Sequence, residues 1–290
     1  MSSIPGKLPI VRSVLHPTDL SPDSEIAFQH ALAVALLRQT SLTLLHVGEL
    51  PEDSDFPSVR EMLERWGLLE EGSSRSAVYE NFKVRIKKKV VRGRPLPAIL
   101  DQLDRGQFDL VVMATHGSSG GSSWLKSSVS EPLAHRTETS TLFVPADSPG
   151  IVDPTSGQLT IRKILLPVAE VPDGQNAVTL AARTAIAASQ THGEEVEIRL
   201  AHVGDQMPQL QLPEHDGIRW SQSLHSGEVI ERIVETARDL QADLIVMSSD
   251  GRNGILDAFR GSHSEQILRL AACPMMVVPI TAHSMPLLLT

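Results

Sequence analysis

Two stretches that match each other without a gap decide the fold: DLVVMATHG at Asp109–Gly117 and DLIVMSSDG at Asp243–Gly251. In each stretch a continuous apolar run follows an aspartate and leads into a loop that contains glycine. A short apolar run without alternation is typical of a strand that is covered on both faces, as in a parallel sheet. The match extends over about fifty residues, starting at Gly93 and Gly227, so the chain contains an internal repeat.

Earlier parts of the chain repeat as well, at a larger spacing. The triplet HVG ends an apolar run at His46–Gly48 and again at His202–Gly204, and Pro17 and Pro167 end the apolar runs before these. A long alanine-rich helical pattern follows each of the two prolines. Because the spacing between the copies shrinks after HVG, the second copy lacks roughly twenty residues before Gly227.

We therefore predict two domains of one fold. The first is expected at residues 1–149 and the second, which is shorter, at 158–290. Residues 150–157 are predicted to form a linker, because Pro, Gly, Ser and Asp cluster around them. A length of 290 residues fits two domains of ordinary size.

Strands and helices are expected to alternate in each domain. In the first domain the patterns predict strands at 10–16, 42–47, 82–91, 109–115 and 141–145 and helices at 22–39, 57–70, 95–105 and 128–138. Such alternation predicts βαβ units with right-handed crossovers and thus a doubly wound, parallel α/β fold. We predict the strand order 3-2-1-4-5, in which ligands bind outside the carboxyl ends of the first and fourth strands.

Composition disfavours several classes of function. The formal net charge of −9 disfavours nucleic acid and anionic membranes as partners. Aromatic residues make up only 3%, which argues against a stacking platform for single-stranded nucleic acid. The one cysteine, Cys273, allows neither an intramolecular disulfide nor a cysteine cluster for zinc. No apolar run reaches the length of a membrane span and the N-terminus lacks the apolar part of a signal peptide, so we expect a cytoplasmic protein.

A glycine- and serine-rich loop follows the fourth predicted strand of each domain, at 114–129 and at 248–263. Backbone N–H groups of such a loop, and of the helix start behind it, are suited to bind an anion. Neither loop has the glycine–lysine pattern of a P-loop or the spacing of a dinucleotide fingerprint. On spacing alone, an anion site and a flexible surface loop with an ordinary helix cap both remain open.

At these loops the sequence resembles the universal stress protein family, in its tandem two-domain form. Nucleotide-binding members of that family carry G-x-x-G, nine further residues and then G-[ST]. The first loop keeps this spacing with Ala114, Gly117, Ser127 and Ser128, and the second with Ser248, Gly251, Gly261 and Ser262. Alanine or serine replaces glycine at three of these positions, and each added Cβ narrows the approach of a phosphate. The resemblance implies an adenine nucleotide alpha hydrolase-like fold in both domains.

Further residues of the first domain resemble the family's nucleoside site. Pro17, Thr18 and Asp19 lie at the end of the first strand, where the family's aspartate lies beside the nucleoside. Val47 corresponds to a valine that lines the family's adenine pocket, and Met113 precedes the glycine- and serine-rich loop as in nucleotide-binding members. The first domain therefore keeps the nucleoside end of the family's site.

The second domain keeps only part of this pattern. Val203 and Met247 occupy the positions that correspond to Val47 and Met113, whereas Ala169 stands where the first domain has its aspartate. Whether the carboxylate of the neighbouring Glu170 takes over the role of that aspartate remains open. The resemblance implies a nucleotide site that consists, in the two domains together, of Pro17, Thr18, Asp19, Val47, Met113, Ala114, His116, Gly117, Ser127, Ser128, Val129, Val203, Met247, Ser248, Gly251, Gly261 and Ser262.

The function implied by the resemblance is stress response or signalling through binding of ATP, or of ADP or AMP. Mg²⁺ would be held by the phosphates alone, and no strong catalysis is expected. The last strands, 141–145 and 275–280, would pair across a pseudo-twofold axis, within the chain as a pseudo-dimer or between chains as a homodimer. Two alternatives remain: a nucleotide-free scaffold that acts through dimerisation or partner binding, and a slow ATPase.

Other polar features have simpler interpretations. The stretch FKVRIKKKVVRGR at Phe82–Arg94 alternates apolar and basic residues at its start, which predicts an edge strand whose solvated face is protected by lysines. A role of Arg92 or Arg94 near phosphates is the alternative. The histidines lack the spacing of a metal site, and Ser128 is not part of a nucleophile elbow, so we expect neither a protein-built metal site nor a hydrolase.

Overall fold

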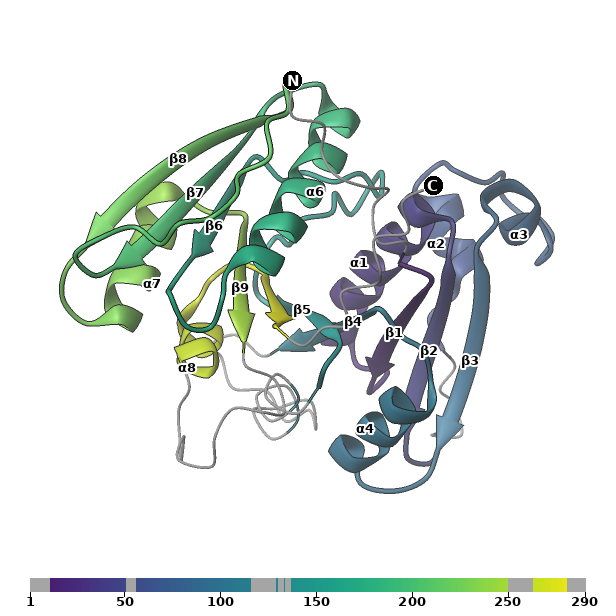
Figure 1. The fold of residues 1–290 in the computed structure, drawn as a ribbon. Coiled ribbons are helices and arrows are strands. Elements are labelled where there is room, and N and C mark those ends of the chain that lie inside the picture. The colour runs from purple at the N-terminus through teal and green to yellow at the C-terminus, as the bar shows by residue number, and fades with distance from the viewer. Residues whose placement is uncertain are drawn as a thin grey trace, which may run out of the picture. The chain divides into compact units, whose positions relative to one another are not determined.

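The computed structural model describes residues 11–50, 56–115, 129, 133, 137–249 and 263–280. Contacts within the chain divide it into two compact units. The first unit consists of Ile10–Leu133 and Thr141–Leu159, and the second consists chiefly of Thr160–Thr290. In each unit, helices lie against a sheet (Figure 1).

The first unit contains five strands and four described helices. The strands are β1 (Ser13–Thr18), β2 (Ser41–Val47), β3 (Arg85–Val91), β4 (Leu110–Thr115) and β5 (Ser140–Pro145), and the helices are α1 (Pro22–Arg38), α2 (Val59–Arg65), α3 (Ala77–Phe82) and α4 (Pro95–Arg105). The strands lie in the order β3-β2-β1-β4-β5. β1 pairs in parallel with β2 on one side and with β4 on the other, so the strand order reverses between β1 and β4.

The second unit repeats this topology with fewer helices. Its strands are β6 (Lys163–Pro167), β7 (Val196–Val203), β8 (Ile218–His225), β9 (Leu244–Ser249) and β10 (Met275–Pro279), and its helices are α6 (Gln175–His192), α7 (Val229–Leu240) and α8 (His263–Leu270). The order β8-β7-β6-β9-β10 corresponds strand by strand to that of the first unit. The predicted doubly wound fold and its strand order are therefore confirmed in both copies.

The residues that the second copy lacks are those of α2 and α3. Residues 204–217, which join β7 to β8, contain no helix, whereas two helices join β2 to β3. Among the described helices of both units, none is long and apolar enough to cross a membrane.

Two predicted boundaries in the first unit were wrong. The predicted helix at 57–70 ends with α2 at Arg65, and Gly67 turns the chain with a φ of +67°. The predicted strand at 82–91 begins only at Arg85, because α3 occupies Ala77–Phe82 and ends at Lys83, which takes a left-handed φ of +58°. The predicted helix at 128–138 lies almost entirely outside the described residues.

The aspartate that opens each of the two matched stretches anchors the neighbouring strand. Asp109 Oδ2 accepts hydrogen bonds from the backbone N–H groups of Arg12 and Ser13, at 2.7 and 3.1 Å, where β1 begins. Asp243 Oδ2 accepts from Arg162 and Lys163, at 2.8 and 2.9 Å, where β6 begins. The carboxylates satisfy N–H groups at the starts of these strands and help to set the register of the central strand pair.

The stretch with linker composition packs against the first unit. The N–H of Ile151 donates to His30 Nε2 of α1 over 2.8 Å, and the Trp66 indole donates to the carbonyl of Pro154 over 3.1 Å. Gly157 lies so close to this indole that a Cβ would come within 2.4 Å of it. The structure thus attaches residues 150–157 to the first unit, while the domain boundaries at 149 and 158 stay predictions.

Two buried histidines of the first unit are held in the neutral form. His30 Nδ1–H donates to the carbonyl of Ile26 and His16 Nδ1–H donates to that of Val112. Both rings are at most 1% exposed. Burial lowers the pKa of each from 6.5 to about 4, since an imidazolium loses its hydration in the core, although the bonded carbonyls partly oppose this.

We expect these histidines to make the fold sensitive to acid. In the unfolded chain a histidine takes up a proton near pH 6.5, whereas the folded pKa is lower. Stability therefore falls as the pH drops from about 6.5 towards 4. Between pH 7.5 and pH 5, His30 should contribute about 2 kcal/mol of this loss, so urea unfolding of His30→Gln should show a correspondingly weaker pH dependence.

The matched control is Leu37→Ala, which changes an exposed side chain of the same helix α1 that carries no titratable group. This variant should keep the pH dependence of the unmodified chain. If His30→Gln kept it too, His30 would not be buried in its neutral form.

Candidate functional site

The carboxyl ends of three neighbouring strands bring the predicted nucleoside residues together. β2, β1 and β4 are adjacent and parallel, and they end with Val47, with Thr18 followed by Asp19, and with Ala114 and Thr115. Val47, Thr18 and Ala114 are buried, whereas Asp19 is half-buried. This edge is the switch point of the doubly wound sheet, where such folds bind their ligands.

The histidine of the HVG triplet joins two of these strand ends in both copies. His46 Nδ1–H donates to the carbonyl of Thr18 over 3.0 Å, and His202 Nδ1–H donates to that of Val168 over 2.8 Å. The glycine that follows leaves room for the ring, since a Cβ on Gly204 would come within 2.4 Å of His202 Nε2. The sequence analysis used the triplet to align the copies and to place Val47 and Val203, but it missed this role of the histidine, although the repetition of HVG was the signal.

Asp19 is held in the turn between β1 and α1. Its Oδ1 accepts three hydrogen bonds: from the backbone N–H of Ser21 at 3.1 Å, from the Ser21 hydroxyl at 2.6 Å and from the Ser24 hydroxyl at 2.6 Å. Leu20 between them takes a φ of +64°, which is strained for a residue with a side chain, and its N–H donates to Thr18 Oγ1. The carboxylate therefore binds the N-cap residue Ser21 and the first turn of α1, and it is fixed in position at the strand end.

The phosphate side of the predicted site is described only where β4 and the loop meet. Met113 and Ala114 are buried, and so is Val129. His116, Gly117, Ser127 and Ser128 lie outside the described residues. Thr115 Oγ1 is buried and has no hydrogen-bond partner among the described residues, which leaves one hydroxyl at the start of the loop with its hydrogen bonding unsatisfied.

The second copy has two such hydroxyls at the same place. Met247 and Ser248 are buried at the end of β9, and the hydroxyls of Ser248 and Ser249 both lack a partner within the described part of the chain. Ser249 corresponds to Thr115 in the gapless match. Gly251, Gly261 and Ser262 lie outside the described residues. Buried hydroxyls that lack a partner among the described residues thus occur at the end of the fourth strand in both units.

The nucleoside side of the second copy differs from the first. Ala169 follows β6, and the exposed Glu170 lies in the turn behind it. The carboxylate that meets the start of α6 belongs to Asp173, whose Oδ1 accepts from the N–H of Gln175 over 2.9 Å. Val203, at the end of β7, is half-buried. In this unit the carboxylate at the start of the helix is therefore that of Asp173, which lies farther from the strand end along the chain.

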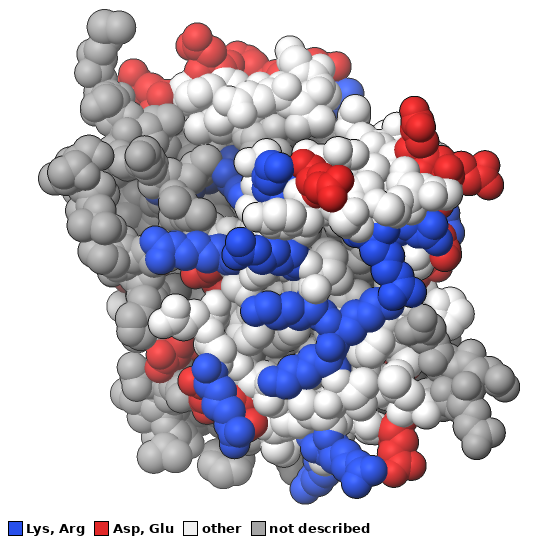
Figure 2. Space-filling view, turned by 90° about the vertical axis from the view of Figure 1, so that its right-hand side faces the viewer, with Lys and Arg blue, Asp and Glu red and all other residues white. Residues whose placement is uncertain are grey.

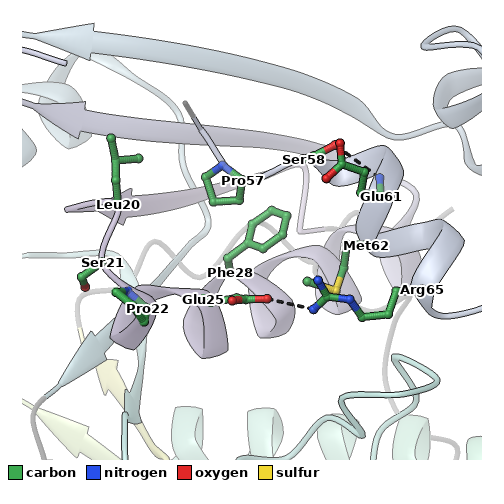
Figure 3. A pocket seen from close by; sticks show the side chains of 10 residues that line it. All are labelled: Leu20, Ser21, Pro22, Glu25, Phe28, Pro57, Ser58, Glu61, Met62 and Arg65. Carbon is green, nitrogen blue, oxygen red and sulfur yellow. Dashed lines mark hydrogen bonds and ion pairs between the residues drawn. The ribbon is translucent and has the colours of Figure 1, made fainter. Parts of the chain in front are cut away.

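A cavity of about 330 Å³ opens between α1 and α2 in the first unit (Figure 3). The side chains of Phe28 and Met62 provide apolar surface, and Glu25 and Arg65 form an ion pair at 2.9 Å between the two helices. The lining residues are Leu20, Ser21, Pro22, Glu25, Phe28, Pro57, Ser58, Glu61, Met62 and Arg65. None of these residues belongs to the predicted nucleotide site. The cavity depends on how α2 packs, and of the turn after Asp19 it contains Leu20, Ser21 and Pro22.

The described residues hold no cluster of three or more His, Cys, Asp or Glu that could bind a metal ion. Cys273 is half-buried, and burial raises the pKa of its thiol to about 12, so the thiolate that a metal or an electrophile would need is scarce at neutral pH.

The fold defines a doubly wound α/β domain that is present twice in one chain, with a glycine- and serine-rich sequence after the fourth strand of each copy. A carboxylate at the end of the first strand, that of Asp19, is found in the first copy, where the second has Ala169. The sequence matches the Universal stress protein family over residues 11–145 and 194–279, and the chain belongs to this family.

Relatives of similar length support this assignment. The chain is 24% identical over 295 residues to a universal stress protein of Mycobacterium tuberculosis, across 89% of this chain and 94% of that protein. It is 30% identical over 143 residues to one of Mycolicibacterium smegmatis, across 48% of this chain and 46% of the other. A universal stress protein from Archaeoglobus fulgidus has a similar fold, with a TM-score of 0.58 at 17% identity, covering 93% of this chain and 98% of that one.

The hydrogen bonds of Asp19 predict how its variants will behave. Asp19→Ala removes the acceptor of three hydrogen bonds from Ser21 and Ser24 and should lower the free energy of unfolding by about 1–2 kcal/mol. Asp19→Asn keeps an oxygen at the same place and should lose clearly less. Urea unfolding of the full chain measures both. Asp173→Ala is the matched control in the second unit: it removes a single hydrogen bond and should cost less than Asp19→Ala. Equal losses in Asp19→Ala and Asp19→Asn would mean that the charge, rather than the hydrogen bonds, stabilises this turn.

Proposed function

We propose that the first unit binds an adenine nucleotide at the carboxyl ends of β2, β1 and β4, with the nucleoside beside Asp19 and Val47. The observation that carries the proposal is the meeting of a fixed carboxylate, an apolar strand end and a glycine- and serine-rich loop at the switch point of the sheet. Membership of the universal stress protein family, whose nucleotide-binding members share these positions, points in the same direction.

Each part of this edge has chemistry that suits one part of the nucleotide. The buried Val47 offers an apolar wall to a base, and a carboxylate such as that of Asp19 accepts hydrogen bonds from ribose hydroxyls. The loop after β4 would supply backbone N–H groups to the phosphates, and the buried hydroxyl of Thr115 offers a further polar group at its start. Mg²⁺ would be held by the phosphates, since the described residues contain no metal cluster of their own.

The second unit would bind nucleotide more weakly or not at all. It keeps the hydroxyls of Ser248 and Ser249 at the phosphate side, but Ala169 supplies no carboxylate for a ribose. The asymmetry between Asp19 and Ala169 therefore predicts one principal site per chain. In this proposal the protein is a binding and signalling protein of the cytoplasm without strong catalysis, and ATP acts by shifting a conformational or oligomeric equilibrium.

One observation favours the alternative, a scaffold that binds no nucleotide. Asp19 Oδ1 already accepts three hydrogen bonds within its own turn, so this oxygen is not available to a ribose. The replacement of glycine by Ala114 at the start of the loop adds to this argument. A scaffold would act through dimerisation or through a protein partner.

A thermal-shift titration of the full chain with MgATP separates the two. A ligand at a hundred times its Kd stabilises the folded state by about 2.7 kcal/mol, which raises the Tm of a domain of this size by several degrees. Asp19→Asn keeps an oxygen acceptor for Ser21 and Ser24 and should raise the MgATP concentration needed for the same shift about tenfold. Ala169→Asn should leave the shift unchanged. Calorimetric titration should give one principal site per chain. No shift at millimolar MgATP would favour the scaffold.

A further inference from the structure

The chain between β5 and β6 contains a compact strap, formed by residues 150–159, that has hydrogen bonds of its own. The N–H of Asp153 donates to the carbonyl of Gln158 over 2.8 Å. The carboxylate of Asp153 accepts from the N–H groups of Thr155 and Ser156 over 2.8 and 2.9 Å. These bonds lie within the strap, so they do not depend on its contacts with the rest of the first unit.

Two further hydrogen bonds attach the strap to helices of the first unit. The N–H of Ile151 donates to His30 Nε2 of α1 over 2.8 Å, and the indole of Trp66, at the end of α2, donates to the carbonyl of Pro154 over 3.1 Å. Gly150 lies against the imidazole, since a Cβ at this position would come within 2.4 Å of His30 Cε1. The strap therefore covers the ring of His30, and the same ring holds the strap.

The hydrogen bonds of His30 decide which ring nitrogen carries the proton. A carbonyl only accepts, so Nδ1 must bear the hydrogen that is donated to Ile26 over 2.7 Å. Nε2 of the neutral ring is then the acceptor for the N–H of Ile151. A second proton on Nε2 would place two donors opposite each other, so this attachment exists only while His30 is neutral.

Uncharged groups surround the ring on α1 and on the strap. The side chains three and four positions away on α1 are all apolar: Ile26, Ala27, Ala33 and Val34. On the strap, Gly150 and Ile151 contact the ring. Burial lowers the pKa of His30 to about 4, the carbonyl of Ile26 partly opposes this, and no charged side chain among the described residues contributes.

We propose that His30 and the strap form an acid-sensitive latch, in which protonation of His30 releases residues 150–159 from α1 as one piece. The hydrogen bonds of Asp153 with Thr155 and Ser156 lower the pKa of its carboxyl group, so the turn inside the strap persists at pH 5. While the strap is attached, the chain that leads to β6 leaves the first unit behind residue 159. After release, roughly ten more residues join the flexible connection to the second unit, which weakens the coupling between the units.

The expected size of the effect follows from the two states of His30. In the released state the ring is hydrated and titrates near its ordinary pKa of 6.5, whereas the pKa in the attached state is about 4. Because the released state binds the proton more tightly, acid favours release as the pH falls below about 6.5. Between pH 7.5 and pH 5 the ratio of released to attached strap should rise about thirtyfold.

The test is amide hydrogen exchange in the full chain at pH 7.5 and pH 5, expressed as protection relative to unstructured peptides. The protection of the Ile151 amide should fall about thirtyfold at pH 5. Small additions of urea should leave it unchanged, because release of the strap exposes little surface. The amide of Leu15, which is buried in β1, should respond to urea, because its exchange requires the unit to unfold.

Two variants separate the histidine from the other attachment. His30→Gln keeps an oxygen that can accept from Ile151 but does not titrate, so the protection of Ile151 should be nearly the same at both pH values. Trp66→Phe is the matched control: it removes the hydrogen bond to Pro154 and should lower this protection about fivefold at each pH, with the thirtyfold ratio unchanged. Circular dichroism and Tm confirm that each variant is folded.

A third variant controls for the charge of the protein as a whole. Lys and Arg side chains gather across one face of the protein (Figure 2), and Lys87 of β3 is exposed. Lys87→Ser removes one charge far along the chain from the strap and should leave the thirtyfold ratio unchanged. The proposal is overturned if the protection of Ile151 is equal at the two pH values, if it responds to urea as that of Leu15 does, or if His30→Gln keeps the fall.

Discussion

The carboxylates of Asp109 and Asp243 make the contact on which the rest of each unit depends. Each accepts hydrogen bonds from two consecutive N–H groups of the adjacent central strand, and each stands directly before a strand that is buried along its whole length. Because the starts of the two central strands of each unit are held in register, the carboxyl ends of these strands meet at one edge of the sheet. That edge is the switch point, so the position of the candidate site follows from a contact at the opposite end of the strands.

The residues at the carboxyl edge serve the fold and the proposed site together. His46 ties the end of β2 to that of β1, and the carboxylate of Asp19 orders the turn into α1 at the edge where we propose that a ribose binds. The second copy keeps the hydrogen bond of the histidine, but the carboxylate at the start of its helix α6 belongs to Asp173. The second copy thus folds with Ala169 in place of the aspartate, and under the proposed function this replacement affects binding rather than folding.

Duplication has also left the two copies with different surfaces. The helices α2 and α3 occur only in the first copy, where α2 packs beside α1 to form the cavity at Phe28 and Met62. The same unit carries the basic edge of β3, whereas β8 pairs its arginine with Glu197. Both copies share the hydrogen-bonded strands of the sheet. They differ in the helices that cover these strands and in the side chains of the edge strand.

The sequence by itself determined the repeat and the strands and helices of each copy, because burial imposes a periodicity that can be read locally. The predicted strand order followed from the doubly wound fold class, and the resemblance to the family came from the spacing of the two glycine- and serine-rich loops. The sequence predicted β4 and β9 well, since each is apolar at nearly every position, and it erred at residues 57–91, where short helices lack a strong period. Only the tertiary structure decided that His30 accepts a hydrogen bond from Ile151, that Asp19 accepts one from Ser24 and that the hydroxyls of Thr115 and Ser249 lack partners within the described residues. These facts depend on which groups meet across the fold, and the distance between two groups along the chain does not reveal this.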